Sequence, residues 1–245
     1  MTAVRALSRS VLADQVRDHL LDGILSGRYP PDSRIVETQV ARQLGTSQAP
    51  VREALRGLEA IGVVEILPFR GARVRRPTRR ELLDAYAVRS SLESLGARLA
   101  VPRMTDADVA ELLGLGQEMA AAAQRGDGHG VAAADARFHE RIVELADNAT
   151  LHKTWRSLEP FSRTYITLVV PGADPAWSAH LHTPILDALR RRDAESVVAA
   201  LERHFAEARE NMAHRWPAID ADEPTQPPSG RGRSGDPATS IAGRP

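Results

Sequence analysis

The chain has 245 residues, a formal net charge of zero and no cysteine. A chain of this length has room for one large domain or two modest ones, and we expect two. The absence of cysteine excludes disulfides and thiolate metal sites, so any metal must be bound by histidine and carboxylate. No apolar run approaches the roughly 20 residues that span a bilayer, and no signal peptide is recognisable. The sequence therefore predicts a soluble, cytoplasmic protein with no membrane partner.

Charge is distributed unevenly along the chain. Residues 1–77 contain 12 arginines and 8 acidic residues, whereas residues 78–217 contain 17 basic and 20 acidic residues. A basic first third beside an acidic remainder indicates that only the first part binds a polyanion. The alternative is an arginine-rich surface that is merely solvated.

The first third of the chain predicts three helices and a hairpin. Apolar residues at helical spacing indicate helices over residues 11–28 and 35–45 and over residues 47–62, which Ser47 begins and Gly62 ends. Two short helices joined by a tight turn form a helix-turn-helix. The alternating segment 63–76 predicts a two-stranded hairpin with its tip at residues 68–71, and six arginines lie between residues 70 and 80. Such a hairpin is typical of a wing.

This arrangement favours binding to double-stranded DNA. The start of the second helix of such a unit enters the major groove, where Arg52 can reach a guanine while Ser47 and backbone N–H groups bind phosphate. The wing arginines would then contact the minor groove or the DNA backbone. The alternative is a small three-helix domain whose hairpin is only a scaffold.

The remainder predicts an all-helical domain and a disordered tail. Thr78 and Glu81 fit a capping box that begins a helix ending near Ala100, and residues 105–108 begin the next helix. Four more helices are expected after residues 125–130, 147–150, 171–175 and 191–193. We therefore predict a mainly α fold with a winged helix-turn-helix domain (1–77), a six-helix bundle (78–217) and a disordered tail (218–245).

Four side chains of the predicted bundle have the types and spacing of metal ligands. Asp135 and His139 lie four residues apart, so they share a helix face. His182 and His204 have apolar neighbours at three- and four-residue offsets, which points both side chains inward. One buried histidine alone is more often satisfied by a hydrogen bond, and Asp135 with His139 alone could be only a salt-bridged turn. Four inward side chains on three helices instead favour a metal site.

The first third resembles the winged helix-turn-helix of the GntR family of bacterial transcription regulators, above all in "PVREALRGLE" and "RGARV". The resemblance covers residues 11–75. It implies DNA contacts by Thr38, Ser47, Gln48, Ala49, Pro50, Arg52, Arg70 and Gly71.

Three positions depart from the family pattern. The family usually has "SRTPVREAL" where this chain has "SQAPVREAL", so Gln48 replaces an arginine and Ala49 replaces a hydroxyl residue. Because glutamine favours adenine in direct readout, we expect an operator that differs from the usual family sequence. Asp32 replaces the glycine typical of the turn before the second helix, which we expect to matter less.

Residues 78–217 resemble the FCD ligand-binding domain of the FadR subfamily, on the motif "DARFHERIVELADNATL" and the segment "HTPILDALRRRDAESVVAALERHF". The resemblance implies metal ligation by Asp135, His139, His182 and His204. Leu181 stands where the family usually has a glutamate, a departure that bears on metal affinity. Three imidazoles and one carboxylate suit Zn²⁺, Ni²⁺, Mn²⁺ or Fe²⁺. The other five histidines are expected at the surface, with His180 as an alternative ligand.

These features together predict a dimeric transcription regulator that binds a pseudo-palindromic operator. The resemblance implies that it is a repressor, and activation stays open as the alternative. A small organic acid would bind at the metal and to Arg89. The alternative for Arg89 is an ordinary surface salt bridge. Arg163 is a second effector-binding candidate, for which we favour a structural role. Two alternatives stay open: a metalloenzyme of bundle type, and a DNA binder whose metal is purely structural.

Overall fold

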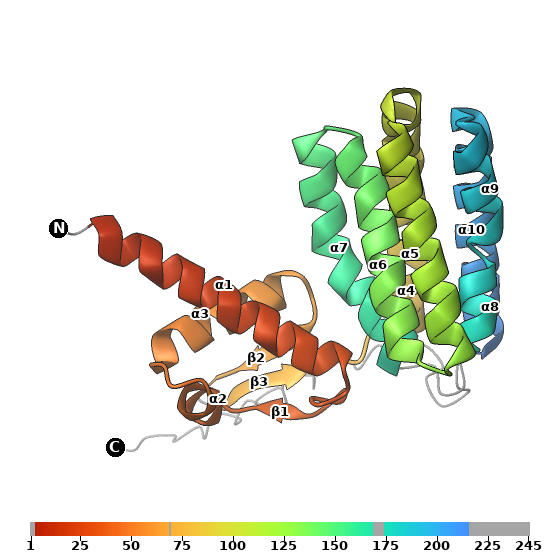
Figure 1. The fold of residues 1–245 in the computed structure, drawn as a ribbon. Coiled ribbons are helices and arrows are strands. Elements are labelled where there is room, and N and C mark those ends of the chain that lie inside the picture. The colour runs from red at the N-terminus through yellow and green to blue at the C-terminus, as the bar shows by residue number, and fades with distance from the viewer. Residues whose placement is uncertain (1–2, 69, 169–173, 216–245) are drawn as a thin grey trace, which may run out of the picture.

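The structure of the protein, a computed structural model, describes residues 3–68, 70–168 and 174–215 (Figure 1). The predicted tail, residues 218–245, lies outside the described residues. Two separate hydrophobic cores are present, one formed between Val16 and Val74 and the other between Leu82 and Met212. The chain passes from one core to the other just before the helix that begins at Arg79.

The first core is built from three helices and a small sheet. The helices are α1 (Ala3–Leu25), α2 (Glu37–Gln43) and α3 (Gln48–Ala60), and the strands are β1 (Arg34–Ile35), β2 (Val64–Leu67) and β3 (Gly71–Val74). The strands form an antiparallel sheet in the order β1-β3-β2. Where the sequence predicted a two-stranded hairpin, β1 adds a third strand. Two residues are too few to show an alternating pattern, so only pairing with β3 reveals this strand.

Glycines end the two helices of the helix-turn-helix. Gly45 follows α2 with φ +61°, and Gly62 follows α3 with φ +75°, the left-handed conformation that glycine adopts without strain. Asp32 also has a positive φ, +69°, which explains why a glycine suits this position in related sequences. Aspartate tolerates the conformation better than most residues, and here its carboxylate accepts a hydrogen bond from Arg76.

The second core is all helical. It contains α4 (Arg79–Ala100), a short 3₁₀ helix (Val101–Arg103), α5 (Asp106–Gln124), α6 (Gly128–Leu145), α7 (Ala149–Leu168), α8 (Pro175–His180), α9 (Thr183–Arg191) and α10 (Ala194–Arg215). Complete capping boxes begin α4 at Thr78 and α5 at Thr105. The mainly α fold class is confirmed.

The helix count differs from the prediction of six, because the described part of this domain contains seven α-helices. The segment predicted as one helix after residues 171–175 is divided into α8 and α9. Pro184 explains the break, since it lacks the N–H that would continue the hydrogen-bond ladder of α8. The break has a structural consequence: it places His182 at the start of α9 rather than within a continuous helix.

The two domains contact each other through α1 and α7 (Figure 1). Arg75, just after β3, also ties the wing to the second domain. Its guanidinium donates to the carbonyl oxygen of Gly62 at 3.1 Å and to the carboxylate of Glu81 at 2.6 Å. Among the described residues, no helix is both long and apolar enough to span a membrane.

Candidate metal centre and nucleic-acid interface

The four predicted metal ligands meet inside the helical domain. Asp135 and His139 project from α6, His182 lies at the start of α9, and His204 lies on α10. All three imidazoles are buried, and one ligand atom from each of the four residues lies within 4.8 Å of the others. Residues that are distant in sequence therefore form one compact donor set.

The distances between donor atoms fit a single cation. Nε2 of His139 lies 3.2 Å from Nε2 of His182, and Oδ1 of Asp135 lies 3.0 Å from the latter and 3.6 Å from the former. With metal–ligand bonds of about 2.1 Å, neighbouring ligands lie about 3.0 Å apart in an octahedral site and about 3.4 Å apart in a tetrahedral site. The donor set thus has the spacing of a coordination shell.

Hydrogen bonds orient two of the imidazoles toward the centre. Nδ1 of His182 donates to the carbonyl oxygen of Ser178 at 3.0 Å, and Nδ1 of His139 donates to the carboxylate of Glu93. In the neutral tautomers so defined, each Nε2 carries the lone pair that a metal needs. Nδ1 of His204 is buried without a hydrogen-bond partner, an unusual condition for a buried polar atom. The residues present therefore fit a divalent metal.

The electrostatics of the centre are set by opposing effects of burial and charge. Burial by itself lowers the pKa of His139, but the carboxylates of Glu93 and Asp135 outweigh burial and raise that pKa to about 9. Burial raises the pKa of Asp135, yet His139 and His182 hold it well below its ordinary value. Burial and the neighbouring imidazoles lower the pKa of His204 well below its usual value. Without a metal, a proton on His139 balances the carboxylates.

Glu93 is a component of the centre that the sequence did not reveal. It is completely buried on α4, and its Oε1 accepts hydrogen bonds from Arg89 Nε at 3.1 Å and from Trp155 Nε1 at 2.7 Å, while its Oε2 accepts from His139. Burial raises the pKa of Glu93, but His139 and Arg89 outweigh it, so the pKa is lowered. The four-residue spacing from Arg89 was the only sequence signal, and exposed helical pairs show the same spacing.

Arg89 lies beside the centre, but it is already paired. Only 3% of it is exposed, and its guanidinium contacts Glu93 at 3.0 Å and packs 5.4 Å from the ring centroid of Trp155. The salt bridge considered in the sequence analysis is therefore real, but it is buried rather than at the surface. Arg163 belongs to α7, and its side chain lies outside the described residues.

The remaining histidines are not part of this cluster. His180 is the exposed last residue of α8, and it does not join the four residues of the donor set. His152 lies 3.1 Å from Glu140 on the outer side of α6, and His19 lies 3.1 Å from Arg28. His129 and His214 are exposed.

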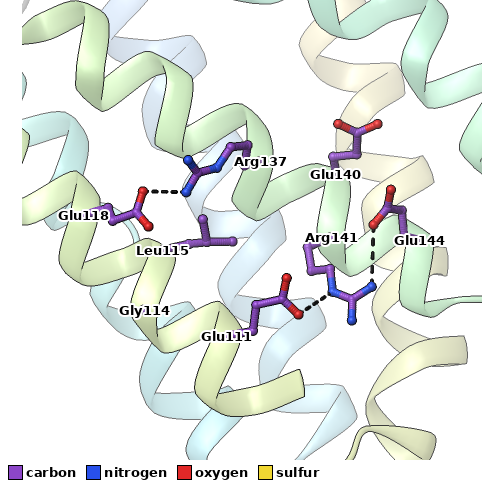
Figure 2. A pocket seen from close by; sticks show the side chains of 8 residues that line it. All are labelled: Glu111, Gly114, Leu115, Glu118, Arg137, Glu140, Arg141 and Glu144. Atoms are coloured by element: carbon purple, nitrogen blue, oxygen red, sulfur yellow. Dashed lines mark hydrogen bonds and ion pairs between the residues drawn. The ribbon is translucent and has the colours of Figure 1, made fainter. Parts of the chain in front are cut away.

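Ion pairs on the outer face of α6 hold the helix against α5 (Figure 2). There, a groove of about 560 Å³ is lined by both helices. Arg137 pairs with Glu118, and Arg141 pairs with Glu111 and Asp108 at 2.9 Å each. Arg137 and Arg141 are two positions after Asp135 and His139, which directs them to the opposite side of the helix. These outer pairs help to fix the helix that carries two of the donors.

The predicted DNA-contacting residues form a surface at α2, α3 and the wing. Thr38, Ser47, Gln48, Ala49, Arg52 and Arg70 are exposed, whereas Pro50 is buried and Gly71 is half-buried. Arg52 donates to the carboxylate of Glu37 at 3.1 and 3.2 Å. Ser47 precedes α3 without making a side-chain capping bond, which leaves its hydroxyl and the first N–H groups of α3 available to phosphate.

Gly71 has a structural role in addition to its predicted place at DNA. Its φ is +83°, and a Cβ atom there would lie 2.3 Å from the carbonyl oxygen of Ile35. Only glycine fits where β3 begins beside β1.

Comparison with known families assigns both domains. "Bacterial regulatory proteins, gntR family" matches residues 12–74, and "FCD domain" matches residues 84–207. The chain is 36% identical over 217 residues to the "Probable D-xylose utilization operon transcriptional repressor" of Paenarthrobacter nicotinovorans, which covers 89% of this chain and 96% of that relative. It is 32% identical over 183 residues to the "Nta operon transcriptional regulator" of Aminobacter aminovorans, covering 74% and 87% of the two chains.

Solved structures agree with this assignment. McbR/YncC of E. coli superposes with a TM-score of 0.74 at 24% identity, over 83% of this chain and 97% of that chain, which bears on the fold alone. A GntR transcriptional regulator from Rhodococcus sp. RHA1 gives a TM-score of 0.74 at 25% identity, covering 84% and 99% of the two chains. The relatives are named as regulators and not as enzymes. The chain therefore belongs to the GntR family of bacterial transcription regulators, and it carries an FCD domain behind its winged helix-turn-helix.

Proposed function

We propose that this DNA-binding regulator senses a small organic acid at a divalent metal held by Asp135, His139, His182 and His204. The observation that carries the proposal is the convergence of two imidazole Nε2 atoms and one carboxylate oxygen within 3.0 to 3.6 Å, beside a third buried imidazole. Zn²⁺, Ni²⁺, Mn²⁺ and Fe²⁺ all suit this donor set. A bound cation would replace the proton of His139.

The metal would supply a Lewis acid with free coordination positions. Four protein ligands leave two positions of an octahedral ion open, and the two oxygens of a carboxylate can occupy them. Arg89 is a buried cation that is hydrogen-bonded to Glu93, and this pairing means that an acid must share or displace that carboxylate. Leu181 contributes no carboxylate to the site, so Glu93 is the acid that orients a ligand here.

For DNA, we propose that the N-terminal turn of α3 enters the major groove. Arg52 and Gln48 would contact bases. The DNA backbone would be contacted by Thr38 and Ser47, with Ala49 and Pro50 shaping the surface beside it. Arg70 and Gly71 would place the wing beside the duplex. Repression relieved by the acid is the mode that we favour, consistent with a relative named as a repressor.

An exposed apolar stripe on α4 supports a homodimer. Val88, Leu95 and Leu99 are 47%, 43% and 37% exposed, and Leu92 lies between them at the spacing of one helix face. Apolar residues at four- and three-residue intervals allow two copies of a helix to pack across a two-fold axis. Two-fold symmetry of the regulator would require a pseudo-palindromic operator.

The test of the proposed function combines metal analysis with thermal melts. Elemental mass spectrometry of the purified full chain should find about one metal per chain. A small carboxylate should raise the melting temperature only when the metal is present, because a ligand stabilises the state that binds it. D-xylose, a neutral sugar and not an acid, is tested beside the carboxylates because one relative is named for D-xylose utilization. Absence of metal, or an acid response that survives chelation, would contradict the metal-centred sensor.

The main alternative is a DNA binder whose metal is only structural. Chelation distinguishes a structural metal from a sensing metal. Removal of a structural metal would unfold the helical domain, whereas a sensor would remain folded and lose its response to the acid. The extensive apolar core of the helical domain favours the second outcome.

A further inference from the structure

A groove separates the DNA-binding domain from the helical domain. It has a volume of about 750 Å³, and its walls come from α1 and α3 on one side and from α6 and α7 on the other. Leu21 and Ile61 contribute apolar surface from the first domain, and His152, Lys153 and Trp155 contribute from the second. Both walls carry charges, among them Asp18 on α1 and Arg156 on α7. The groove is thus part of the interface through which the domains contact each other.

Trp155 belongs both to this groove and to the surroundings of the metal centre. Its side chain is almost wholly buried, it lines the groove, and its indole N–H donates to Oε1 of Glu93 at 2.7 Å. The other oxygen of Glu93 accepts from Nδ1 of His139. Two consecutive hydrogen bonds therefore connect a metal ligand to the wall of the interdomain groove.

Trp155 shares its hydrogen-bond acceptor with two residues of the candidate centre. Glu93 is held by Arg89, His139 and Trp155 at once, so a shift of any one donor changes the geometry available to the others. Under the proposed function, occupation of the centre would act on two of these donors, on His139 as a ligand and on Arg89 as a partner for an acid. The third donor, Trp155, is the one that reaches the groove.

We infer that Trp155 is the positioning residue that couples occupation of the metal centre to the placement of the DNA-binding domain against α7. This inference rests on the proposed function, since it requires both metal binding and operator binding. Coupling is a free energy shared by two sites, so it must appear equally in the effect of DNA on metal affinity and in the effect of metal on DNA affinity. A position between two sites does not by itself demonstrate coupling. Coupling is measured by the ratio of the Kd for metal without DNA to the Kd for metal with DNA.

The experiment measures that ratio with the full chain and Zn²⁺ as the probe. A DNA duplex is first selected from a random pool by the wild-type protein. The Kd for Zn²⁺ is then measured by competition with a chromogenic chelator, with and without the duplex. Wild type should show a difference of about 5- to 150-fold between the two values, the usual range of coupling. Trp155→Phe keeps an aromatic ring but removes the donor, and its ratio should fall to about 1.

The ratio divides out any change in basal affinity, so a purely structural effect of Trp155→Phe on metal binding does not move it. Trp177→Phe is the matched control, because Trp177 lies on α8 and does not line the groove. It should keep the wild-type ratio. Circular dichroism checks that each variant is folded.

A second variant changes the groove without touching the core. Lys153 is exposed on α7, and Lys153→Glu adds an acid to a groove that Asp18, Asp22 and Glu159 also line. Repulsion should move the walls apart and lower the ratio, although the bond between Trp155 and Glu93 is retained. This variant tests the groove even if Trp155→Phe fails to fold.

The outcomes separate the inference from the function on which it rests. A wild-type chain that binds neither Zn²⁺ nor any duplex would refute the proposed function, and the inference with it. A wild type that binds both with a ratio of 1 would overturn the inference alone. The inference would also be overturned if the wild-type ratio differs from 1 and both Trp155→Phe and Lys153→Glu keep the wild-type ratio.

Discussion

Glu93 shows how one buried carboxylate can organise a site without being one of the four candidate metal ligands. It fixes the tautomer of His139, neutralises Arg89 and accepts the indole N–H of Trp155. Such a residue must be surrounded by donors, because an unpaired buried carboxylate is costly. The three donors come from α4, α6 and α7, so the carboxylate also joins three helices.

We expect Glu93→Gln to raise the Kd for Zn²⁺ by about 10- to 100-fold, because loss of a partner behind a metal-binding histidine typically has that effect. Isothermal titration calorimetry on the folded variant measures the change. Glu118→Gln is the control, since Glu118 pairs with Arg137 on the outer face of the domain. A Kd within twofold of wild type for Glu93→Gln would show that His139 does not need this partner.

At the DNA surface, Arg52→Ala should weaken binding to the selected operator by roughly 1–3 kcal/mol, the usual value of a good base contact. Fluorescence anisotropy on the operator and on a scrambled duplex measures affinity and specificity. Arg190→Ala on α9, which removes an exposed arginine of the helical domain, should leave both affinities unchanged. Equal losses on both duplexes would place Arg52 at phosphate rather than at a base.

Among the elements, α4 presents two different faces. Its inner face carries Arg89 and Glu93, and its outer face carries the apolar stripe of Val88, Leu92, Leu95 and Leu99. A dimer formed through the outer face would therefore place the two metal centres behind the same interface. This arrangement would let the acid influence how the two DNA-binding domains are spaced.

Leu95→Glu should convert the dimer to a monomer, because it places a charge in the centre of the apolar stripe. Sedimentation velocity measures the oligomeric state. Leu12→Glu is the matched control, since Leu12 is a leucine on α1 that is 38% exposed, close to the 43% of Leu95. If Leu95→Glu sediments like wild type, α4 is not the dimer interface.

The wing depends on a backbone conformation that only glycine adopts easily. Gly71→Ala should lower the free energy of unfolding by about 1–3 kcal/mol, because the new Cβ meets the carbonyl oxygen of Ile35 and φ is positive. Urea denaturation followed by circular dichroism measures the loss. Gly114→Ala, in α5 with open space around its Cα, should be neutral or stabilise by up to about 1 kcal/mol. Equal effects of the two substitutions would refute the steric explanation.

At the scale of the whole molecule, two separate cores would allow the domains to move relative to each other without unfolding. Neither core shares buried residues with the other, and the contacts between the domains run through α1, α7 and Arg75. An interface of this kind can adopt a second arrangement without unfolding either domain. The candidate metal centre lies within the second domain, so any effect of its occupation on DNA binding would have to cross the interface.

Chelation should lower the melting temperature by roughly 5–10 °C while the helical content is retained. The metal contributes about 2.7 kcal/mol when its concentration is a hundred times its Kd, and each kcal/mol shifts a chain of this size by about 2–4 °C. Melts with and without a chelator, followed by circular dichroism at 20 °C, measure both quantities. Loss of helical signal at that temperature would instead indicate a structural metal.

Local patterns in the sequence determined most of the elements. Capping residues, glycines and apolar spacing predicted the helices of the winged domain and the start of α4, and the four-residue spacing of Asp135 and His139 placed both on one face. Apolar neighbours pointed His182 and His204 inward, and the resemblance to a known family agreed with the four candidate ligands and supplied most of the expected DNA contacts. These features depend on neighbours within one or two turns, which is why a sequence reveals them.

Only the tertiary structure decided which residues surround the candidate metal centre and which hydrogen bonds connect them to the rest of the molecule. The bond between Glu93 and His139 joins residues 46 positions apart, and that between Trp155 and Glu93 joins residues 62 positions apart. The third strand of the sheet is defined by pairing with β3, not by its own two residues. Long-range contacts have no periodicity along the chain, because they are set by how whole elements pack.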